Sequence, residues 1–206
     1  MISARGLTKT YERVPAVRAI DLEVAPGETI ALLGANGAGK TTLLRMLATL
    51  DKPTAGQLEI AGIDALRKPQ QVRALLGLVA HQTYLHPELS AAEDLRFYGQ
   101  LYGVPELDRR IERLLAEFGL AGRGGSRVAA LSRGQQQRLT IARALLHEPT
   151  ILLMDEPDTG LDAEGMTVLE RLLRAGGRTV IFSSHNARWA ESVSRRVITL
   201  MNGRLA

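Results

Sequence analysis

A glycine-rich segment between an apolar run and a helix-like run constrains the fold of this 206-residue chain more than any other feature. Residues 31–42 read Ala-Leu-Leu-Gly-Ala-Asn-Gly-Ala-Gly-Lys-Thr-Thr, and the pattern G-x-x-x-x-G-K-[ST] falls on Gly34, Gly39, Lys40 and Thr41. Glycines let the backbone adopt positive φ and turn several N–H groups toward one anion, and the following helix directs its positive end to the same place. The segment therefore predicts a phosphate-binding loop within an α/β domain.

Two side chains of the loop have chemistry of their own. Lys40 can reach the β- and γ-phosphates of a nucleotide, and the Thr41 hydroxyl can hold Mg²⁺. A glycine-rich strand-to-helix turn without a ligand is the alternative, and the matching flanks disfavour it. The nucleotide-binding residues that we expect are Gly34, Ala35, Asn36, Gly37, Ala38, Gly39, Lys40, Thr41 and Thr42.

Composition narrows the class of protein. The chain is 45% hydrophobic and 23% charged, which is typical of one globular domain with a real core. It has no cysteine, which excludes disulfides, thiol catalysis and Cys-ligated zinc. The net charge of +4 comes from basic residues spread along the chain, so we expect no nucleic-acid-binding stripe. The N-terminus lacks the apolar core of a signal peptide and no apolar run approaches about 18 residues, so we expect a cytosolic chain that does not cross a bilayer.

The apolar pattern predicts a parallel-sheet domain interrupted by a helical insert. The elements expected, in order, are strands and hairpins over 2–33, a helix over 41–50, a strand over 57–60, helices over most of 88–146, a strand over 151–154, a helix over 163–174, a strand over 179–183, a helix over 187–194 and a hairpin through Asn202-Gly203. We therefore expect a single domain over 1–206, with a helical subdomain over about 88–146.

Two carboxylates, Asp155 and Glu156, follow the apolar run 150–154. A buried strand would deliver Asp155 to the sheet edge beside the phosphate loop, where it can orient Mg²⁺ through water. Glu156 would then lie near the γ-phosphate, placed to polarise an attacking water. An acidic turn ended by Pro157 is the alternative, which the phosphate loop upstream makes much weaker.

The segment Leu131-Ser132-Arg133-Gly134-Gln135 precedes another helix-periodic run. Ser132-x-x-Gln135 is a capping box, and a helix start of this kind can also bind an anion.

Together these motifs resemble those of the nucleotide-binding subunit of ABC transporters, over essentially the whole chain. The loop 34–42 resembles the family's phosphate loop, Asp155-Glu156 its second acidic motif, and 131–135 its signature. The resemblance implies the ABC ATPase fold, which is a P-loop NTPase with a mostly parallel sheet, an N-terminal antiparallel β subdomain and a helical insert. It also implies hydrolysis of ATP with Mg²⁺.

Four further residues match family motifs in the family's order. By resemblance, Gln82 would sense Mg²⁺ and the attacking water, and Asp162 in Leu161-Asp162 would line a dimer interface. His185, at the end of the last parallel strand, would hydrogen-bond the γ-phosphate, and Tyr11 matches the aromatic residue that stacks on adenine.

Other positions depart from the family or have no family role. Arg133 stands where the signature usually has its first glycine, and Asp158 stands where a neutral residue is commoner. Neither departure removes a group named above, so we expect them to affect rates only. His81 and His86 flank the glutamine without an implied role, and we expect them to be surface residues.

The resemblance implies that two chains face one another head to tail, as a homodimer or as a heterodimer with another ABC subunit. Each ATP would lie between one chain's loop 34–42 and the partner's Ser132, Arg133, Gly134 and Gln135. Integral membrane permease subunits would be the partners, with no nucleic acid, and the chain would be peripheral on the cytoplasmic side of the cell membrane.

Several segments bear on the transported cargo. His81-Gln82, 95–103 and 131–138 are similar to the ATP-binding subunit of cytochrome c maturation, which implies haem export. The alternatives are a drug or multidrug exporter subunit, a soluble ABC-type ATPase acting on nucleic acid or ribosomes, and a scaffold ATPase for cluster assembly.

Four of the eight aromatic residues fall between the glutamine and the end of the next helix, namely Tyr84, Phe97, Tyr98 and Tyr102. Tyr98 and Tyr102 share one helical face with Leu95 and Leu101. This face either packs inside the helical insert or contributes to a groove for a short helix of the membrane subunit.

Overall fold

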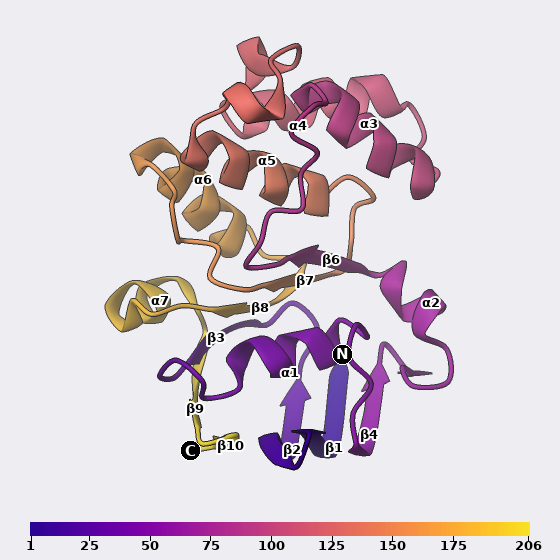
Figure 1. Ribbon diagram of the computed structural model, residues 1–206, viewed down its shortest axis with the longest axis vertical. Helices are drawn as coiled ribbons and strands as arrows, with labels where there is room; N and C mark the ends of the chain where they lie inside the picture. Colours follow the sequence, from indigo (N-terminus) through magenta and orange to yellow (C-terminus); the bar gives the residue numbers. More distant parts are fainter.

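The computed structural model describes residues 1–206, whose strands form two sheets (Figure 1). The antiparallel sheet has the order β2-β1-β4-β5, with β1 (Ile2–Tyr11), β2 (Val14–Val24), β4 (Ala55–Ile60) and β5 (Ile63–Asp64). The main sheet has the order β10-β9-β3-β8-β7-β6, with β3 (Thr29–Leu33), β6 (Leu76–Val79), β7 (Ile151–Met154), β8 (Thr179–Ser183), β9 (Arg196–Met201) and β10 (Arg204–Leu205). Its neighbouring strands are parallel except for β10 against β9.

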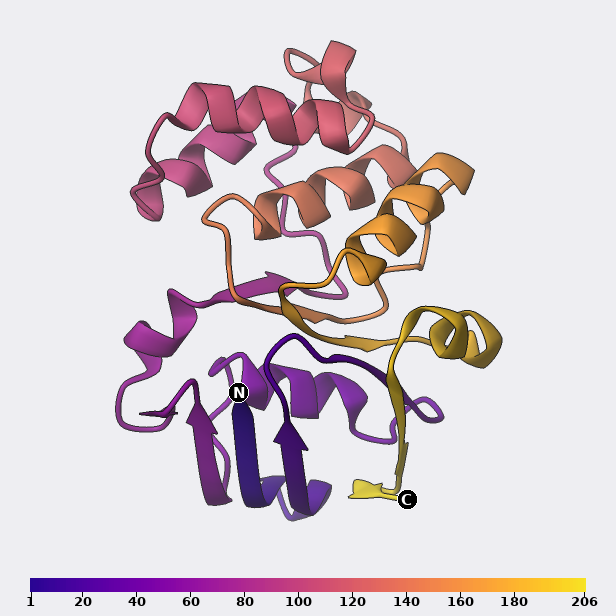
Figure 2. The same cartoon turned by 180° about the vertical axis from the view of Figure 1, so that it is seen from behind.

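The helices cover the main sheet and extend the molecule at one end. They are α1 (Lys40–Leu47), α2 (Pro69–Arg73), α3 (Ala91–Leu101), α4 (Leu107–Glu117), α5 (Arg133–Ala144), α6 (Ala163–Arg174) and α7 (Ala187–Val193), with short 3₁₀ turns at Ala121–Arg123 and Val128–Ala130. Figures 1 and 2 show α3 and α4 at one end, the antiparallel sheet at the other, and the main sheet between them. None of the helices has both the length and the apolarity needed to cross a membrane.

The main sheet is buried on both faces, which explains its continuous apolar strands. On β7, Ile151 and Leu153 face a core that α1 and the antiparallel sheet share. Leu152 and Met154 face the opposite core, which includes residues of α5, α6 and α7. Because β3, β7 and β8 run parallel, their carboxyl ends lie at one edge of the sheet, where ligands bind in open parallel sheets.

The predicted α/β architecture, with a mostly parallel sheet, an antiparallel β part and a helical insert, is confirmed. The helix predicted over 41–50 was too long, because α1 ends at Leu47 and Thr49 adopts a φ of 57°, so Leu50 leaves the helix and is 49% exposed. The strand β6 was missed, since four residues give too little periodicity. The strand β8 is not the last parallel one, because β9 pairs in parallel with β3.

Candidate nucleotide-binding site

The loop between β3 and α1 forms the floor of the site. Gly34 and Gly39 adopt φ of 148° and 105°, and a Cβ would lie 2.4 Å from the Leu200 carbonyl oxygen at the first and 2.5 Å from the Ala16 carbonyl oxygen at the second. Only glycine fits both the torsion and the space. Gly39 is the N-cap of α1 and provides no side-chain cap, so the first N–H groups of this helix are left for a ligand.

Lys40 and Thr41 lie at the start of α1. Lys40 is buried, and its Nζ donates hydrogen bonds to the carbonyl oxygens of Gly34 at 2.7 Å and Ala35 at 3.2 Å. The Thr41 hydroxyl donates to Asp155 Oδ2 at 2.8 Å. A hydroxyl and a carboxylate oxygen thus meet beside the phosphate loop, and this oxygen donor set fits Mg²⁺.

Ser183, at the end of β8, contacts the side chain of Asp155 and the backbone of Glu156. Its hydroxyl donates to Asp155 Oδ1 at 2.6 Å and accepts the backbone N–H of Glu156 at 2.9 Å. Asp155 is 4% exposed, whereas Glu156 adopts a left-handed φ of 52° and is only partly buried. This torsion is uncommon for a residue with a side chain, and it is held here by the buried Ser183 contact.

Glu156 faces two histidines. His185 Nε2 lies 2.7 Å from Oε1 of Glu156, and His81 Nδ1 lies 3.6 Å from Oε2. All three residues line a cavity of about 820 Å³ together with Tyr11, Ala16, Asn36, Gly37, Ala38, Gly39, Lys40, Thr41, Thr42 and Thr159.

Tyr11 is held at the rim of this cavity. Its hydroxyl donates to Asp51 Oδ2 at 2.6 Å, and Arg45 makes two hydrogen bonds of 2.9 Å to the same carboxylate. The Arg45 guanidinium, followed by the Tyr11 hydroxyl, lowers the pKa of Asp51 to about 2. The Tyr11 side chain remains 43% exposed, so its ring is available for stacking on a flat ligand.

Gln82 does not line this cavity. It lines an adjoining groove of about 490 Å³ with Tyr84, Tyr98 and Leu50, and Thr41 and His81 line both hollows.

The loop that carries Gln82 is fixed by Arg143 of α5. The Arg143 guanidinium donates to the carbonyl oxygens of Thr83 at 2.6 Å and Tyr84 at 2.9 Å. It also lies 4.6 Å from the centroid of the Tyr98 ring. The position of this loop therefore depends on a helix of the insert.

The start of α5 is exposed and lies outside the nucleotide cavity. Ser132 and Gln135 form the predicted capping box. The Gln135 N–H donates to the Ser132 hydroxyl at 3.2 Å, and the Ser132 N–H donates to Gln135 Oε1 at 3.0 Å. The Arg133 side chain packs over Gly160. A Cβ added at Gly160 would lie 2.9 Å from the Nε of Arg133. Gly134 packs closely against Asp162, since a Cβ at Gly134 would lie 3.2 Å from the Asp162 Cγ.

The loop before α6 contains two further carboxylates, Asp158 and Asp162. Asp162 caps α6 by accepting the Gly165 N–H at 2.9 Å, and it pairs with the buried Arg138 at 3.1 Å. Asp158 accepts the Ser184 hydroxyl at 2.8 Å, and its other oxygen is buried without a partner. Burial raises the pKa of Asp158.

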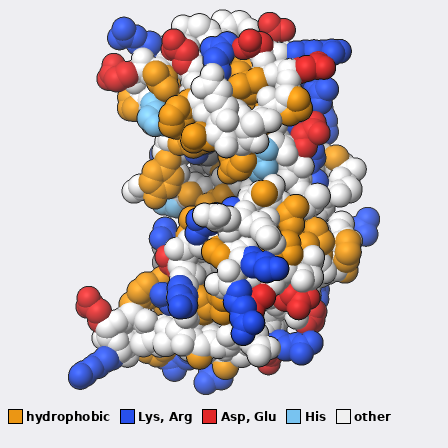
Figure 3. Space-filling view, turned by 90° about the vertical axis from the view of Figure 1, so that its right-hand side faces the viewer, with side chains coloured by type: hydrophobic (Ala, Val, Ile, Leu, Met, Phe, Trp, Pro, Cys, Tyr) orange, Lys and Arg blue, Asp and Glu red, His pale blue; other side chains and the backbone are white.

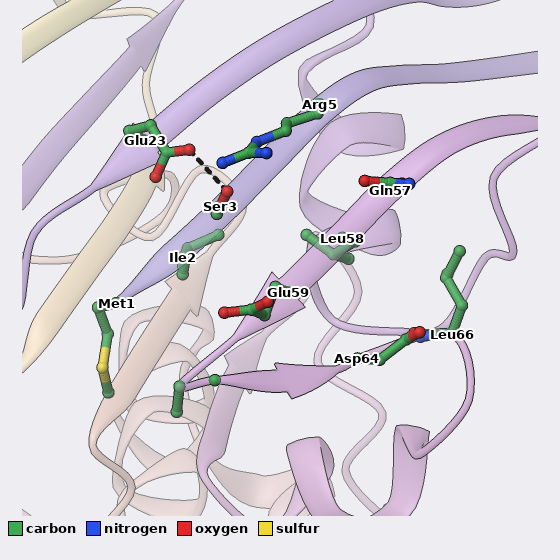
Figure 4. Close-up of a pocket in the computed structure, with 12 residues that line it drawn as sticks. Met1, Ile2, Ser3, Arg5, Glu23, Gln57, Leu58, Glu59, Asp64 and Leu66 are labelled. Carbon is green, nitrogen blue, oxygen red and sulfur yellow. Dashed lines mark hydrogen bonds between the residues drawn. The ribbon is translucent and has the colours of Figure 1, made fainter.

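Another hollow, of about 680 Å³, lies over the antiparallel sheet and shares no lining residue with the nucleotide cavity (Figure 4). Its polar lining includes Ser3, whose hydroxyl donates to Glu23 at 2.6 Å, with Arg5, Glu59 and Asp64 nearby. The hollow contains none of the predicted site residues.

Sequence reasoning missed several residues that position the site. His81, expected to be plain surface, lies in the cavity, and Ser183, Asp51 and Arg143 hold other members of the site through the contacts above. Ser183 could have been found from its place at the end of a parallel strand. Asp51 and Arg143 give no such signal, because their contacts join distant segments.

The arrangement can bind a polyphosphate and activate water. The start of α1 and Lys40 provide positive partial and formal charge, and Thr41 with Asp155 would hold Mg²⁺. Mg²⁺, when bound, neutralises charge on the phosphate oxygens. Glu156 supplies a carboxylate beside this place.

Comparison with known proteins identifies relatives of this arrangement. A family model described as "ABC transporter" matches residues 17–159. The chain is 38% identical over 196 residues to "ABC transporter ATP-binding protein NatA" of Bacillus subtilis, covering 92% of this chain and 80% of the relative. It is 37% identical to "Daunorubicin resistance ATP-binding protein DrrA3" of Streptomyces coeruleorubidus, covering 99% of this chain and 66% of the relative.

A solved structure with the same fold is described as a dimeric post-hydrolysis state of the ATP-binding cassette MJ0796 bound to ADP and Pi. It is similar with a TM-score of 0.91 and 29% identity, and the match covers 100% of this chain and 96% of that one.

Proposed function

The chain belongs to the ABC transporter family, and we propose that two copies of it hydrolyse ATP across a shared head-to-tail interface and so drive a membrane permease. The chain is an ATP-binding subunit of an ABC transporter, with ATPase activity and with ATP and Mg²⁺ as its ligands. The assignment of roles to single residues, the partners and the cargo are the proposal.

One observation carries the head-to-tail arrangement. The phosphate loop, Glu156 and His185 line one cavity, whereas the start of α5 lies on an exposed surface outside it. The first N–H groups of α5 have no partner within the helix, so they suit a phosphate of a nucleotide held by another chain. A two-fold axis would bring Ser132, Arg133, Gly134 and Gln135 of each copy to the cavity of the other.

We assign the chemistry as follows. Glu156 polarises the attacking water, His185 contacts the γ-phosphate, and Lys40 binds the β- and γ-phosphates. Tyr11 stacks on the adenine, and Asp162 lies at the dimer interface beside the start of α5. Gln82 reaches Mg²⁺ and the water from the adjoining groove, which requires its exposed side chain to turn toward Thr41.

The test compares Glu156→Gln with Lys40→Ala by ATPase assay and by light scattering with ATP and Mg²⁺. We expect Glu156→Gln to bind ATP, lose turnover and accumulate a dimer, because the water lacks its base while every phosphate contact remains. Lys40→Ala should lose ATP binding itself. Near-normal turnover in Glu156→Gln would contradict the assignment of the base.

The groove beside the cavity suits a permease helix. It is lined by exposed Tyr84 and Leu50, which are 58% and 49% exposed, and it adjoins Gln82. Figure 3 shows hydrophobic side chains on the face that carries α2 and α3. Exposed aromatic residues such as Tyr84 are enriched at protein interfaces. In this proposal the chain is peripheral on the membrane, on the cytoplasmic side.

The aromatic face expected on α3 has two parts, one that packs inside the helical insert and one that is exposed. Leu95 is fully buried. The Tyr98 ring packs against Phe97, with ring centroids 5.2 Å apart, and against the Arg143 guanidinium. Leu95 and Tyr98 therefore stabilise the insert. Leu101 and Tyr102 are 68% and 46% exposed.

The sharper test of docking is therefore Tyr84→Glu. In cells of the native host, wild-type chain should sediment with membranes and co-purify with an integral membrane protein. Tyr84→Glu should remain in the supernatant while it still binds ATP, and the control Met201→Glu, which changes a 59% exposed residue of β9, should sediment normally. Sedimentation of Tyr84→Glu with the same membrane protein would show that the groove is not the docking site.

For the cargo, we propose export of a drug-type small molecule. The similarity to DrrA3 supports a drug-type cargo, whereas haem export is supported only by the short segments noted in the sequence. Identification of the co-purified permease distinguishes the two.

A further inference from the structure

His81 is the one residue of the Gln82 loop that faces the carboxylate of Glu156. Its side chain is 62% exposed and lines the nucleotide cavity with Glu156 and His185. At 3.6 Å the Nδ1 to Oε2 contact is longer than a hydrogen bond, and a shift of a few tenths of an ångström would close it. The two oxygens of Glu156 are thus faced by two different imidazoles.

The second imidazole matters once a nucleotide is present. His185 reaches Glu156 through Nε2, at 2.7 Å. In the proposed function the same imidazole contacts the γ-phosphate, and we assign this contact to Nε2, whose single N–H then points at the phosphate and no longer at Glu156. Glu156 would then lose its short contact to His185, and His81 is the remaining side chain in reach of its carboxylate.

The backbone around His81 makes it sensitive to the adjoining groove. Arg143 holds the carbonyl oxygens of Thr83 and Tyr84, two and three residues further along the chain. His81 itself lines both hollows, the nucleotide cavity and the groove that contains Tyr84. A displacement of this loop therefore changes the distance between His81 and Glu156.

We propose that His81 is a positioning residue that holds the Glu156 carboxylate in line with the attacking water while His185 is engaged by the γ-phosphate. It donates its Nδ1–H to Oε2, and no proton is transferred. This inference rests on the proposed function, and it adds a direct link from the Gln82 loop to the catalytic carboxylate.

The experiment measures steady-state ATPase parameters of the full chain with His81→Ala, His81→Asn and Glu88→Gln. Removal of the imidazole should lower kcat on the order of 10-fold and leave KM for ATP nearly unchanged, because an orientation contact is lost while the phosphate and adenine contacts remain. His81→Asn should recover most of the lost rate, since the Asn amide nitrogen takes the place of Nδ1. Glu88→Gln changes an exposed residue of the same loop outside the cavity and should match wild type.

A second measurement separates this inference from the proposed function. His81→Ala/Glu156→Gln should still form the ATP-dependent dimer seen with Glu156→Gln alone. If Glu156→Gln forms that dimer and His81→Ala keeps the wild-type kcat, the role of His81 is overturned and the proposed function stands. A rise in KM that matches the loss of rate would also overturn it, as would an unchanged low rate in a folded His81→Asn. If Glu156→Gln neither stops turnover nor forms a dimer, the proposed function itself fails.

Discussion

The two parts of the proposed ATP site differ in how far a single chain completes them. Around the phosphate loop, Lys40 and Asp155 are buried and Thr41, Asp155 and Ser183 form a continuous hydrogen-bonded chain. At the start of α5, Ser132 is exposed and its capping bonds are made only with Gln135. The first part is organised by contacts within the chain, and the second is organised as a helix start that lies outside the nucleotide cavity.

The two parts differ in which contacts stabilise them. Buried polar groups such as Asp155 must have partners in the folded chain, so the phosphate-loop part is fixed by folding itself. The start of α5 needs only a cap to be stable, so its remaining N–H groups stay available for a second molecule. Substitutions in the two parts should therefore fail at different steps.

The largest effect that separates the two parts is expected from Ser132→Arg. A bulky cation at the exposed start of α5 would block the approach of a partner chain, so turnover should be lost. Binding of ATP to the monomer should remain, because Ser132 does not line the cavity of its own chain. Loss of the cap should cost only about 1 kcal/mol of unfolding free energy.

An ATPase assay combined with a fluorescent-nucleotide titration checks this prediction. Ser192→Arg places the same charge on an exposed serine of α7 and should behave as wild type. Turnover in Ser132→Arg at the wild-type rate would mean that one chain is sufficient for hydrolysis.

A smaller loss is expected from Ser183→Ala, within the phosphate-loop part. The substitution leaves Asp155 Oδ1 and the Glu156 N–H without their shared partner. We expect kcat to fall about 10- to 100-fold through misplacement of both carboxylates. Urea unfolding should show a loss of about 1–3 kcal/mol.

The matched control is Ser194→Ala, which removes a hydroxyl that donates to the Ala190 carbonyl oxygen at 2.7 Å, remote from the cavity. Equal kcat in Ser183→Ala and Ser194→Ala would show that Ser183 does not position the site.

The phosphate-loop part was largely predictable from the sequence because its chemistry is local. The strand, the glycines and Lys40-Thr41 are consecutive, and their torsional demands allow little else. The carboxylates after β7 were predicted because residues that follow a buried parallel strand lie at the carboxyl edge of the sheet, where ligands bind.

What the sequence could not predict lies in contacts between distant segments. Asp51 joins Tyr11 across 40 residues, and Arg143 holds Tyr84 across 59. No periodicity encodes such pairs. His81 was expected on the surface, and it is indeed exposed, but the surface in question is the wall of the nucleotide cavity.

Arg133→Gly should change the rate little, within about two-fold, since glycine at a helix start is tolerated and the backbone N–H stays in place. The Arg133 side chain crosses Gly160 of its own chain, so its removal opens space without removing a donor at the helix start. Arg133→Lys, which keeps the charge, provides the comparison in the same ATPase assay. A loss greater than 10-fold in Arg133→Gly but not in Arg133→Lys would instead place the positive charge on the partner's nucleotide.

The smallest effect concerns Asp51, which holds Tyr11 at the phosphate-loop part. Its pKa is lowered to about 2 in the folded chain from an ordinary value of 3.8, chiefly by the Arg45 guanidinium. A lowered pKa means that the folded state favours the carboxylate. The stabilisation is therefore present above about pH 4 and is lost as the pH falls toward about 2.

Because Arg45 is 45% exposed and solvent screens the pair, the contribution should not exceed about 1 kcal/mol. Urea unfolding of wild type and Asp51→Asn between pH 7 and pH 2 measures it, and Glu191→Gln, an exposed carboxyl of α7, corrects for the general effect of losing one charge. We expect Asp51→Asn to be the less stable at pH 7 and the two curves to converge near pH 2. Parallel curves over the whole range would mean that the Asp51 contacts add nothing to folding, and that Tyr11 is held by its strand alone.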